Sequence, residues 1–198
     1  MNKFKKIKNK ERGFTLVELM VATTIFVVII ISSIGSLLVL LGASKDSRGL
    51  RFAMDNVNFA MESMTRSVRM GINYYCATDP TVSIPTDSET FNNCPGGGTL
   101  LSFIPQANTA SPRVTYKLKT REPSNPNSTR TIERCDGNNC VEIVSSDINI
   151  DTLKFFVIGA DPLDAIQAKV YILLKGTVMV KDKPSSFMIQ TLASQRNY

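Results

Sequence analysis

The hydrophobic pattern of the chain changes at residues 14, 44 and 72, and each change begins a different segment. Residues 14–43 form an apolar run, longer than the about 20 residues with which a helix spans a bilayer. In residues 44–71 apolar side chains recur at alternating spacings of four and three, which predicts an amphipathic helix that ends near Gly71. This stripe consists of Leu50, Met54, Val57, Met61, Met64 and Val68. We therefore expect one nearly continuous helix that begins in the apolar run and ends in a packed domain.

Residues 72–198 have the pattern of short strands separated by Pro, Gly, Asn and Ser residues. Residues 77–98 and 121–128 are expected to be irregular loops, and the glycine run at residues 96–98 lacks the Gly-Lys-Ser/Thr that a phosphate-binding loop needs. The predicted fold class is α+β, with the long N-terminal helix packed on an antiparallel β-sheet. The expected strands are Thr99–Ile104, Arg113–Arg121, Thr129–Arg134, Val141–Val144, Leu153–Ile158, Ala168–Leu174 and Phe187–Leu192.

The positive charge of the chain is concentrated in its first 13 residues. This leader has six lysines and arginines and one glutamate, so it should stay on the cytoplasmic side of a membrane. Without the leader, the 23 basic and 17 acidic residues of the whole chain come close to balance. The basic pI is therefore no argument for a nucleic-acid partner.

Glu18 is the only ionisable residue between Phe14 and Ala43. A carboxylate near the middle of a bilayer helix costs about 2.5–3.5 kcal/mol on insertion scales. A secretory signal peptide does not explain the segment, because its apolar region has only about 7–15 residues. A plain signal anchor whose glutamate reaches the membrane surface remains an alternative. Otherwise the carboxylate needs a partner.

Residues 13–20, Gly-Phe-Thr-Leu-Val-Glu-Leu-Met, resemble the processing and assembly signal of type IV pilins and type II secretion pseudopilins. The resemblance implies that a prepilin peptidase removes residues 1–13 by cutting after Gly13 and methylates the new N-terminus at Phe14. It also implies that Glu18 pairs with the N-terminal amine of a neighbouring subunit. Many major pilins of this family have a helix-breaking proline where this chain has Gly35, so we expect a local weak point there.

The C-terminal half has a fainter resemblance to J-type pseudopilins and PilW-like minor pilins. It rests on Val114–Leu118, on Ile148 through Leu153–Phe156 and on Gln190–Asn197. The long loop at residues 77–98 and the turn between Cys135 and Cys140 depart from that subgroup.

All four cysteines follow the apolar run, on the side that the leader places outside the cytoplasm, so disulfides are expected. Cys135 and Cys140 enclose a four-residue turn, which favours a bond between them. Cys76 would then pair with Cys94, one of the three connectivities that four cysteines allow. A four-thiolate zinc site is the alternative, disfavoured because only one pair is closely spaced.

The sequence offers little catalytic chemistry. It contains no histidine, the commonest general base, and no Gly-x-Ser-x-Gly motif. Residues 147–151 are similar to the opening of a calcium loop, but the interleaved Ile148 and Ile150 favour a strand. Along Arg113–Arg121 the apolar positions are expected to face the core and the polar ones the solvent. The solvent face would carry Arg113, Thr115, Lys117 and Lys119, followed by Arg121, a basic row that could track phosphates.

We interpret the chain as a minor pilin or pseudopilin, a structural subunit of a type IV pilus or type II secretion filament, in its initiating or tip complex. A major subunit, a DNA-binding competence pilin and a membrane-anchored enzyme are the alternatives. The expected partners are prepilin peptidase, other subunits through the N-terminal helix and lipids of the cytoplasmic membrane; nucleic acid is disfavoured, and no cofactor or metal is expected. The chain would cross the inner membrane once, with residues 14–43, and hold residues 44–71 and 72–198 outside the cytoplasm before entering the filament.

Overall fold

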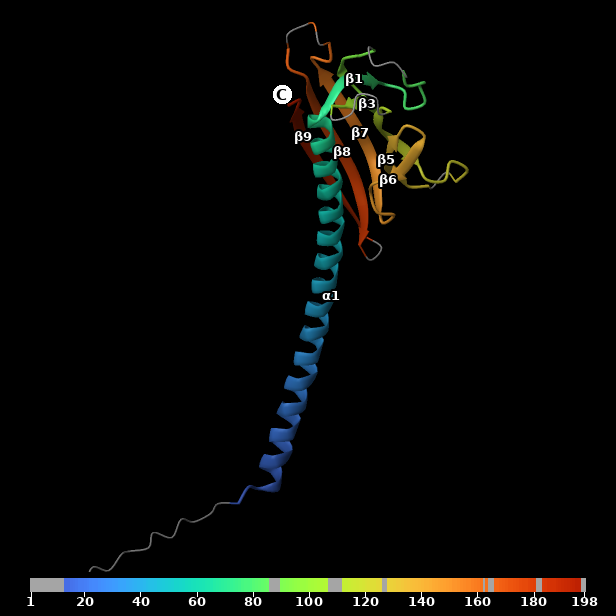
Figure 1. Ribbon diagram of the computed structural model, residues 1–198. Coiled ribbons are helices and arrows are strands. Elements are labelled where there is room, and N and C mark those ends of the chain that lie inside the picture. The colour runs from blue at the N-terminus through green and yellow to red at the C-terminus, as the bar shows by residue number, and fades with distance from the viewer. Residues whose placement is uncertain are drawn as a thin grey trace, which may run out of the picture. The chain divides into compact units, whose positions relative to one another are not determined.

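The computed structural model describes residues 13–85, 90–106, 112–125, 128–161, 163, 166–180 and 183–196. The chain divides into two compact units, Met1–Lys45 and Asp46–Tyr198. A single helix, α1 (Leu16–Arg69), contributes to both units, and antiparallel strands follow it (Figure 1). The α+β class predicted from the sequence is confirmed.

The second unit contains two antiparallel sheets. The five-stranded sheet has the order β1-β3-β4-β5-β6 and the four-stranded sheet the order β2-β7-β8-β9. The strands are β1 (Gly71–Ala77), β2 (Cys94–Gly98), β3 (Leu100–Pro105), β4 (Val114–Thr120), β5 (Arg130–Asp136), β6 (Asn139–Glu142), β7 (Ile148–Ile158), β8 (Lys169–Val180) and β9 (Lys183–Ser194).

Two strands of the structure, β1 and β2, were not predicted from the sequence. The segment at Cys94–Gly98 was expected to be part of a loop, but it forms β2, and β1 was not predicted at all. Because glycine has no side chain, β2 shows no alternation of apolar and polar residues in the sequence. The tertiary structure nevertheless requires a glycine at position 98. A Cβ on Gly98 would lie 2.5 Å from both the carbonyl oxygen of Ala77 and Sγ of Cys76.

The second half of α1 packs its apolar face into the core of the second unit. Four residues of the predicted stripe, Val57, Met61, Met64 and Val68, are fully or almost fully buried. Leu50 is 38% exposed, so the stripe does not extend that far. Ala53 and Ala60 are buried instead, as small residues that a sequence pattern of large side chains overlooks. The sheets contribute Tyr74, Phe103, Tyr116, Phe155, Ile172 and Leu174 to the same cluster.

The C-terminal end of α1 is capped by Tyr74 of β1 and by Arg196, which follows β9. The Tyr74 hydroxyl lies 2.7 Å from the carbonyl oxygens of both Val68 and Gly71, and the amide of Arg196 donates to the carbonyl of Arg69. These contacts satisfy carbonyls that the last turn of a helix leaves without partners. Burial raises the pKa of Tyr74, so its hydroxyl stays protonated and can donate.

The prediction that the polar residues of Arg113–Arg121 face the solvent is wrong for the first two of them, Arg113 just before β4 and Thr115 within it. Arg113 is 7% exposed and Thr115 is 2% exposed. The guanidinium of Arg113 donates to the carbonyl of Asn73, and the hydroxyl of Thr115 donates to that of Ser102. Val114, Thr115 and Tyr116 are all buried, so both faces of β4 are covered at its start, and the polar side chains there are satisfied by hydrogen bonds.

Gly71 gives the first testable prediction. A Cβ at this position would lie 2.5 Å from Cδ2 of the buried Phe103, so Gly71→Ala should lower the free energy of unfolding by about 1–3 kcal/mol. Gly96→Ala is the control, because nothing lies within 4 Å of a Cβ at Gly96. Denaturant unfolding of the full chain in detergent measures both. Equal stability of the two variants would contradict the close packing.

Candidate processing and assembly segment

The peptide bond between Gly13 and Phe14 lies just outside α1. Residues 13–15 are not helical, and the helix begins at Leu16. Nothing lies within 4 Å of a Cβ at Gly13, and Phe14 is 82% exposed. A protease needs such an accessible, non-helical bond. The structure therefore leaves the expected cleavage site open.

Thr15 caps the helix. Its carbonyl accepts a hydrogen bond from the amide of Leu19, and its side-chain oxygen accepts one from the amide of Glu18 at 3.3 Å. Thr15 and Glu18 thus occupy the N-cap and third helical positions, the Thr-x-x-Glu spacing of a capping box. This spacing is a sequence signal for a helix start, which the pattern of apolar residues alone does not show. The cap places Glu18 in the first turn, where the helix dipole favours a carboxylate.

The other polar side chains of the apolar segment are satisfied inside the helix. The hydroxyls of the serines and of Thr23 and Thr24 donate to main-chain carbonyls three or four residues earlier, so they need no outside partner in an apolar surrounding. These residues are Thr23, Thr24, Ser32, Ser33 and Ser36. In the described part of the chain, no donor or cation contacts the carboxylate of Glu18. It is the exception.

The first half of α1 exposes its apolar side chains on every side. All the large ones from Leu16 to Leu41 are at least 38% exposed. The helix is long and apolar enough to cross a membrane. It continues through Gly35 without a break, and a weaker hydrogen-bond ladder at that residue stays a prediction.

Comparison with known proteins identifies this segment. Residues 8–34 match the prokaryotic N-terminal methylation motif. The chain carries the class III signal peptide of the type IV pilin family. No curated protein and no solved structure matches the chain. The motif implies processing by prepilin peptidase, membrane anchoring and assembly with other pilins. It therefore supports a pilin-like or pseudopilin-like structural subunit.

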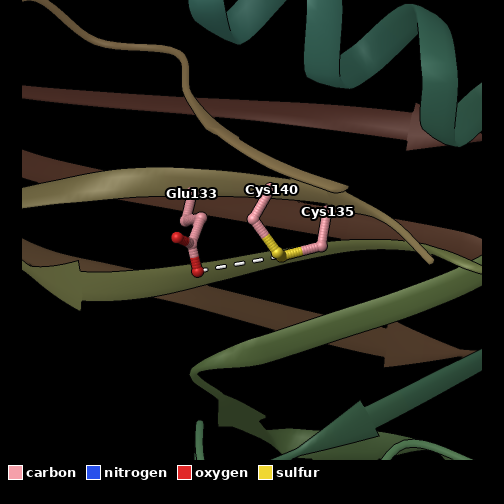
Figure 2. A group of neighbouring side chains, drawn as sticks. All are labelled: Glu133, Cys135 and Cys140. Carbon is pink, nitrogen blue, oxygen red and sulfur yellow. Dashed lines mark hydrogen bonds between the residues drawn. A yellow bond between two sulfur atoms is a disulfide. The ribbon is translucent and has the colours of Figure 1, made fainter. Parts of the chain in front are cut away.

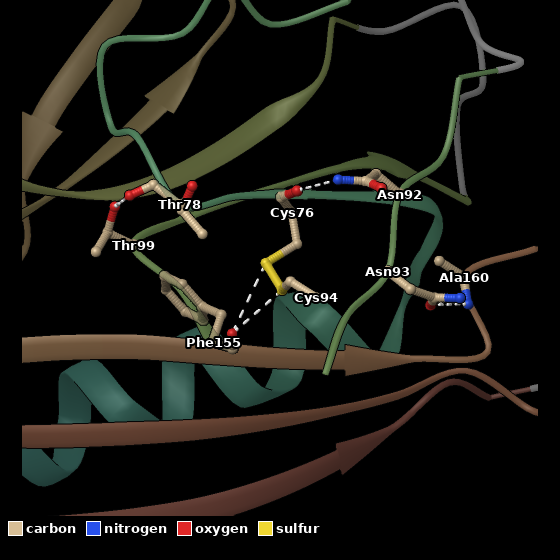
Figure 3. The surroundings of a disulfide bond; sticks show 8 residues. All are labelled: Cys76, Thr78, Asn92, Asn93, Cys94, Thr99, Phe155 and Ala160. Atoms are coloured by element: carbon tan, nitrogen blue, oxygen red, sulfur yellow. Dashed lines mark hydrogen bonds between the residues drawn. A yellow bond between two sulfur atoms is a disulfide. The ribbon is translucent and has the colours of Figure 1, made fainter. Parts of the chain in front are cut away.

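The Cys76–Cys94 disulfide links the two sheets, because Cys76 belongs to β1 and Cys94 to β2 (Figure 3). Sγ of Cys94 lies 3.2 Å from the carbonyl oxygen of Phe155, a contact rather than a hydrogen bond, because a disulfide sulfur has no proton. Asn92 and Asn93 also brace this region with their side chains. Asn92 donates to the carbonyl of Cys76 and Asn93 accepts from the amide of Ala160.

A second disulfide, Cys135–Cys140, joins directly opposite residues of β5 and β6, beside Glu133 (Figure 2). The carboxylate and the two sulfurs lie within 4.8 Å of one another, close enough to be considered as metal ligands. The sulfurs are bonded to each other, however, and therefore offer no thiolate. Glu133 is also paired with Lys117 at 3.4 Å and with Lys119. This donor set does not fit a metal ion.

The environment of Glu133 shifts its pKa. Its burial raises the pKa, but hydrogen bonds from Lys119 and Lys117 and the charges of both lysines lower it more. The net pKa is below the usual value of about 4.5, so the carboxylate stays ionised at neutral pH. Glu133 is thus a buried acid held by two lysines of the neighbouring strand β4.

The basic row of the sequence does not form a free phosphate-binding face. Arg113 is buried, and Lys117 and Lys119 are paired with Glu133. Arg121 forms an ion pair with Glu142 and donates to the carbonyls of several residues that lead into β7. These are Val144, Ser145, Ser146 and Ile148. The cations of this row are therefore occupied within the chain.

Glu133 gives a prediction for pH dependence. A lowered folded-state pKa stabilises the fold above about pH 4.5, and the stabilisation is lost as pH falls through the folded-state pKa. Glu133→Gln should cost about 1–3 kcal/mol at pH 7, and its difference from the parent should shrink as the pH falls from neutral to below the ordinary glutamate pKa of about 4.5.

Chemical denaturation across this pH range measures the effect. Glu62→Gln is the control, because its ion pair with Arg66 is solvent-exposed and should contribute less than about 1 kcal/mol. A constant difference between the Glu133 variant and the parent at all pH values would refute the assignment.

Proposed function

We propose that this chain is a minor pilin or pseudopilin, cut after Gly13 by prepilin peptidase, N-methylated at Phe14 and built into a filament through α1. One observation carries the proposal. Glu18 is an acid in the first half of α1, which is otherwise apolar on every side, and its carboxylate has no partner in the described part of the chain. A side chain in this position needs a cation from another molecule.

The cut itself supplies that cation. Cleavage after Gly13 creates an amine at Phe14, immediately before the Thr15 cap. A neighbouring subunit that presents this amine to Glu18 neutralises a charge in apolar surroundings. Leaving one member of a buried pair without its partner costs about 3–5 kcal/mol. The pairing therefore favours subunits that have been cut and selects the register in which they pack.

The proposed orientation follows from charge and redox chemistry. The basic leader stays in the cytoplasm, α1 crosses the inner membrane once, and the second unit lies outside, where disulfides persist. The exposed apolar half of α1 contacts lipids before assembly and other subunits afterwards. The same helix surface can contact lipids and other subunits because both surroundings are apolar.

We assign the subunit to an initiating or tip complex, with a major filament subunit as the alternative. The likeness of its C-terminal half to J-type pseudopilins and PilW-like minor pilins supports this assignment. The number of copies in purified filaments distinguishes the two roles. The role is structural, in keeping with the lack of histidine and of hydrolase motifs.

Processing provides the first test. Incubation of the full chain with prepilin peptidase and a methyl donor should remove residues 1–13 and methylate the new amine of Phe14, which mass spectrometry of the product detects. Gly13→Ala should reduce cutting by an order of magnitude or more, because a side chain at the cleaved bond restricts close approach. Gly35→Ala should be cut like the parent. Equal cutting of the Gly13 variant would refute the assigned site.

Assembly provides the second test. Glu18→Gln keeps the shape of the side chain but removes its charge, so this variant should be processed normally. Its incorporation into filaments should fall at least about tenfold, because a tenfold change corresponds to only about 1.4 kcal/mol, less than the cost of breaking a buried pair. Thr23→Val is the control, because the Thr23 hydroxyl is satisfied within α1. Quantitative blotting of sheared filaments measures incorporation. Normal incorporation of the Gln variant would exclude the proposed pairing.

A further inference from the structure

β9 differs from the other three strands at the edges of the two sheets. It is 12 residues long and pairs with β8 at every position without a register shift. β1 has a shift between Ile72 and Tyr75, and Asn92 occupies its outer side. β2 contains Pro95 and β6 has only four residues. Natural sheets blunt their edges with such bulges, prolines and short strands, and β9 has none of these devices beyond Pro184 at its start.

The backbone of β9 has a defined free side. The amide of Gln195 donates to the carbonyl of Ala168, the next pair after Lys169 and Ser194. Hydrogen-bonded pairs alternate in an antiparallel ladder, so the odd-numbered residues of β9 bond to β8 and the even-numbered ones point away. The outward groups belong to Ser186, Met188, Gln190 and Leu192. No other described strand pairs with β9 on this side.

The free side ends where the chain itself closes it. Arg196 has the same parity as the outward residues, and its amide donates to the carbonyl of Arg69 at 2.9 Å. The end of α1 thus occupies the position next to Arg196 that an added strand would otherwise fill. From Ser186 to Leu192 no such cover is present in the described residues.

Charge does not protect this edge either. No residue from Ser185 to Ser194 is charged, and the nearest charged residues in the sequence are Lys183 and Arg196. Edge strands are usually guarded by inward-pointing or outward charges, especially lysine. An uncharged extended segment therefore meets no electrostatic barrier along β9.

Apolar side chains on both faces of β9 remain to be covered. Phe187 and Ile189 pack against the core but are only partly buried. On the other face, Met188 is 66% exposed and Leu192 is 46% exposed. Leu192 also lines a hollow of about 690 Å³ with Tyr171 and Phe156. A strand beside β9 would bury more of these side chains on each face.

We propose that β9 is a docking edge, on which an extended segment of a neighbouring subunit adds a further strand to the sheet β2-β7-β8-β9. The unpaired amides and carbonyls recur every second residue, a spacing that an extended backbone matches. The added segment of the neighbour is uncharged, like Ser185–Ser194, and carries apolar side chains at alternate positions. That the neighbour is a filament subunit rests on the proposed function, whereas the open edge does not.

Assembly through α1 makes even weak edge pairing effective. Packing through α1 holds subunits side by side, which gives the edge of β9 and its docking segment a high effective concentration. Strand pairing at β9 then behaves like an intramolecular contact. The backbone bonds supply affinity, and the side chains on alternate residues supply selectivity. β9 therefore fixes which subunit can stand next to this one.

The test uses the full chain in detergent and a fluorescent peptide with the sequence of Ser185–Ser194 as the probe strand. Gln190→Pro removes one outward amide without touching the bonds to β8, and should weaken peptide binding about tenfold or more. Gln190→Ala keeps that amide and should bind within about twofold of the parent. The same peptide N-methylated at alternate residues should not bind.

Hydrogen exchange on the unmodified chain gives an independent readout if the proline variant fails to fold. Binding of the peptide should slow exchange at Met188, Gln190 and Leu192, while Thr191 is already protected by β8. Binding without protection of the outward amides, or equal binding by the folded proline variant, overturns the proposal.

The same variants separate this inference from the proposed function. Gln190→Pro that is cut at Gly13 and still enters filaments at the parent level would overturn docking at β9 and leave the pilin function standing. A chain that is never cut would instead refute the function. Reduced incorporation of Gln190→Pro, with Gln190→Ala normal, supports the docking edge.

Discussion

One helix has to be stable in two different surroundings, and this constraint shapes the rest of the molecule. A helix satisfies its backbone hydrogen bonds within itself, which allows the first half of α1 to expose, apart from Glu18, only apolar side chains and satisfied hydroxyls. The second half turns a face of methionine, alanine and valine toward the sheets. The change from an apolar helix to an amphipathic one lies within a single unbroken element.

The ends of this helix are determined by different means. At its start, a local cap from Thr15 serves the first turn, and no other part of the chain is needed. At its end, Tyr74 and Arg196 close the last turn, so the helix terminus depends on the fold of the second unit. The start therefore keeps its form under the proposed cut after Gly13. The end is as stable as the domain around it.

Most buried polar side chains in the described part of the second unit have hydrogen-bond or ion-pair partners, and the atoms without one are Gln106 Oε1, Tyr116 OH and Thr131 Oγ1. Glu133 is held by two lysines, and Arg113 and Arg121 donate to several carbonyls. Two further features lack a partner in the described residues: the carboxylate of Glu18, in the first unit, and the free side of β9, in the second. A carboxylate in apolar surroundings is neutralised by a cation, whereas an open strand edge is satisfied by another backbone. The pairing proposed for Glu18 and the docking proposed for β9 are therefore different kinds of contact with other subunits.

Local patterns were sufficient for the segment on which the identification rests. The leader charge, the apolar run, Glu18 and the pilin-like signal are all contiguous in the sequence, and helical periodicity located the buried face of α1 at Val57, Met61, Met64 and Val68. The cysteine spacing favoured the two pairs found in the structure. These features depend on neighbours a few residues apart.

Only the tertiary structure decided which strands lie side by side. β2 has no readable pattern because three of its five residues are glycines, of which Gly98 lies against the backbone of Ala77. The basic row looked exposed because alternation does not reveal that the start of β4 is covered on both faces, nor that Glu133 lies opposite Lys117. The open edge of β9 is invisible in the sequence for the same reason. An edge is defined by the absence of a neighbouring strand, and strand neighbours are set by contacts between residues far apart in the chain.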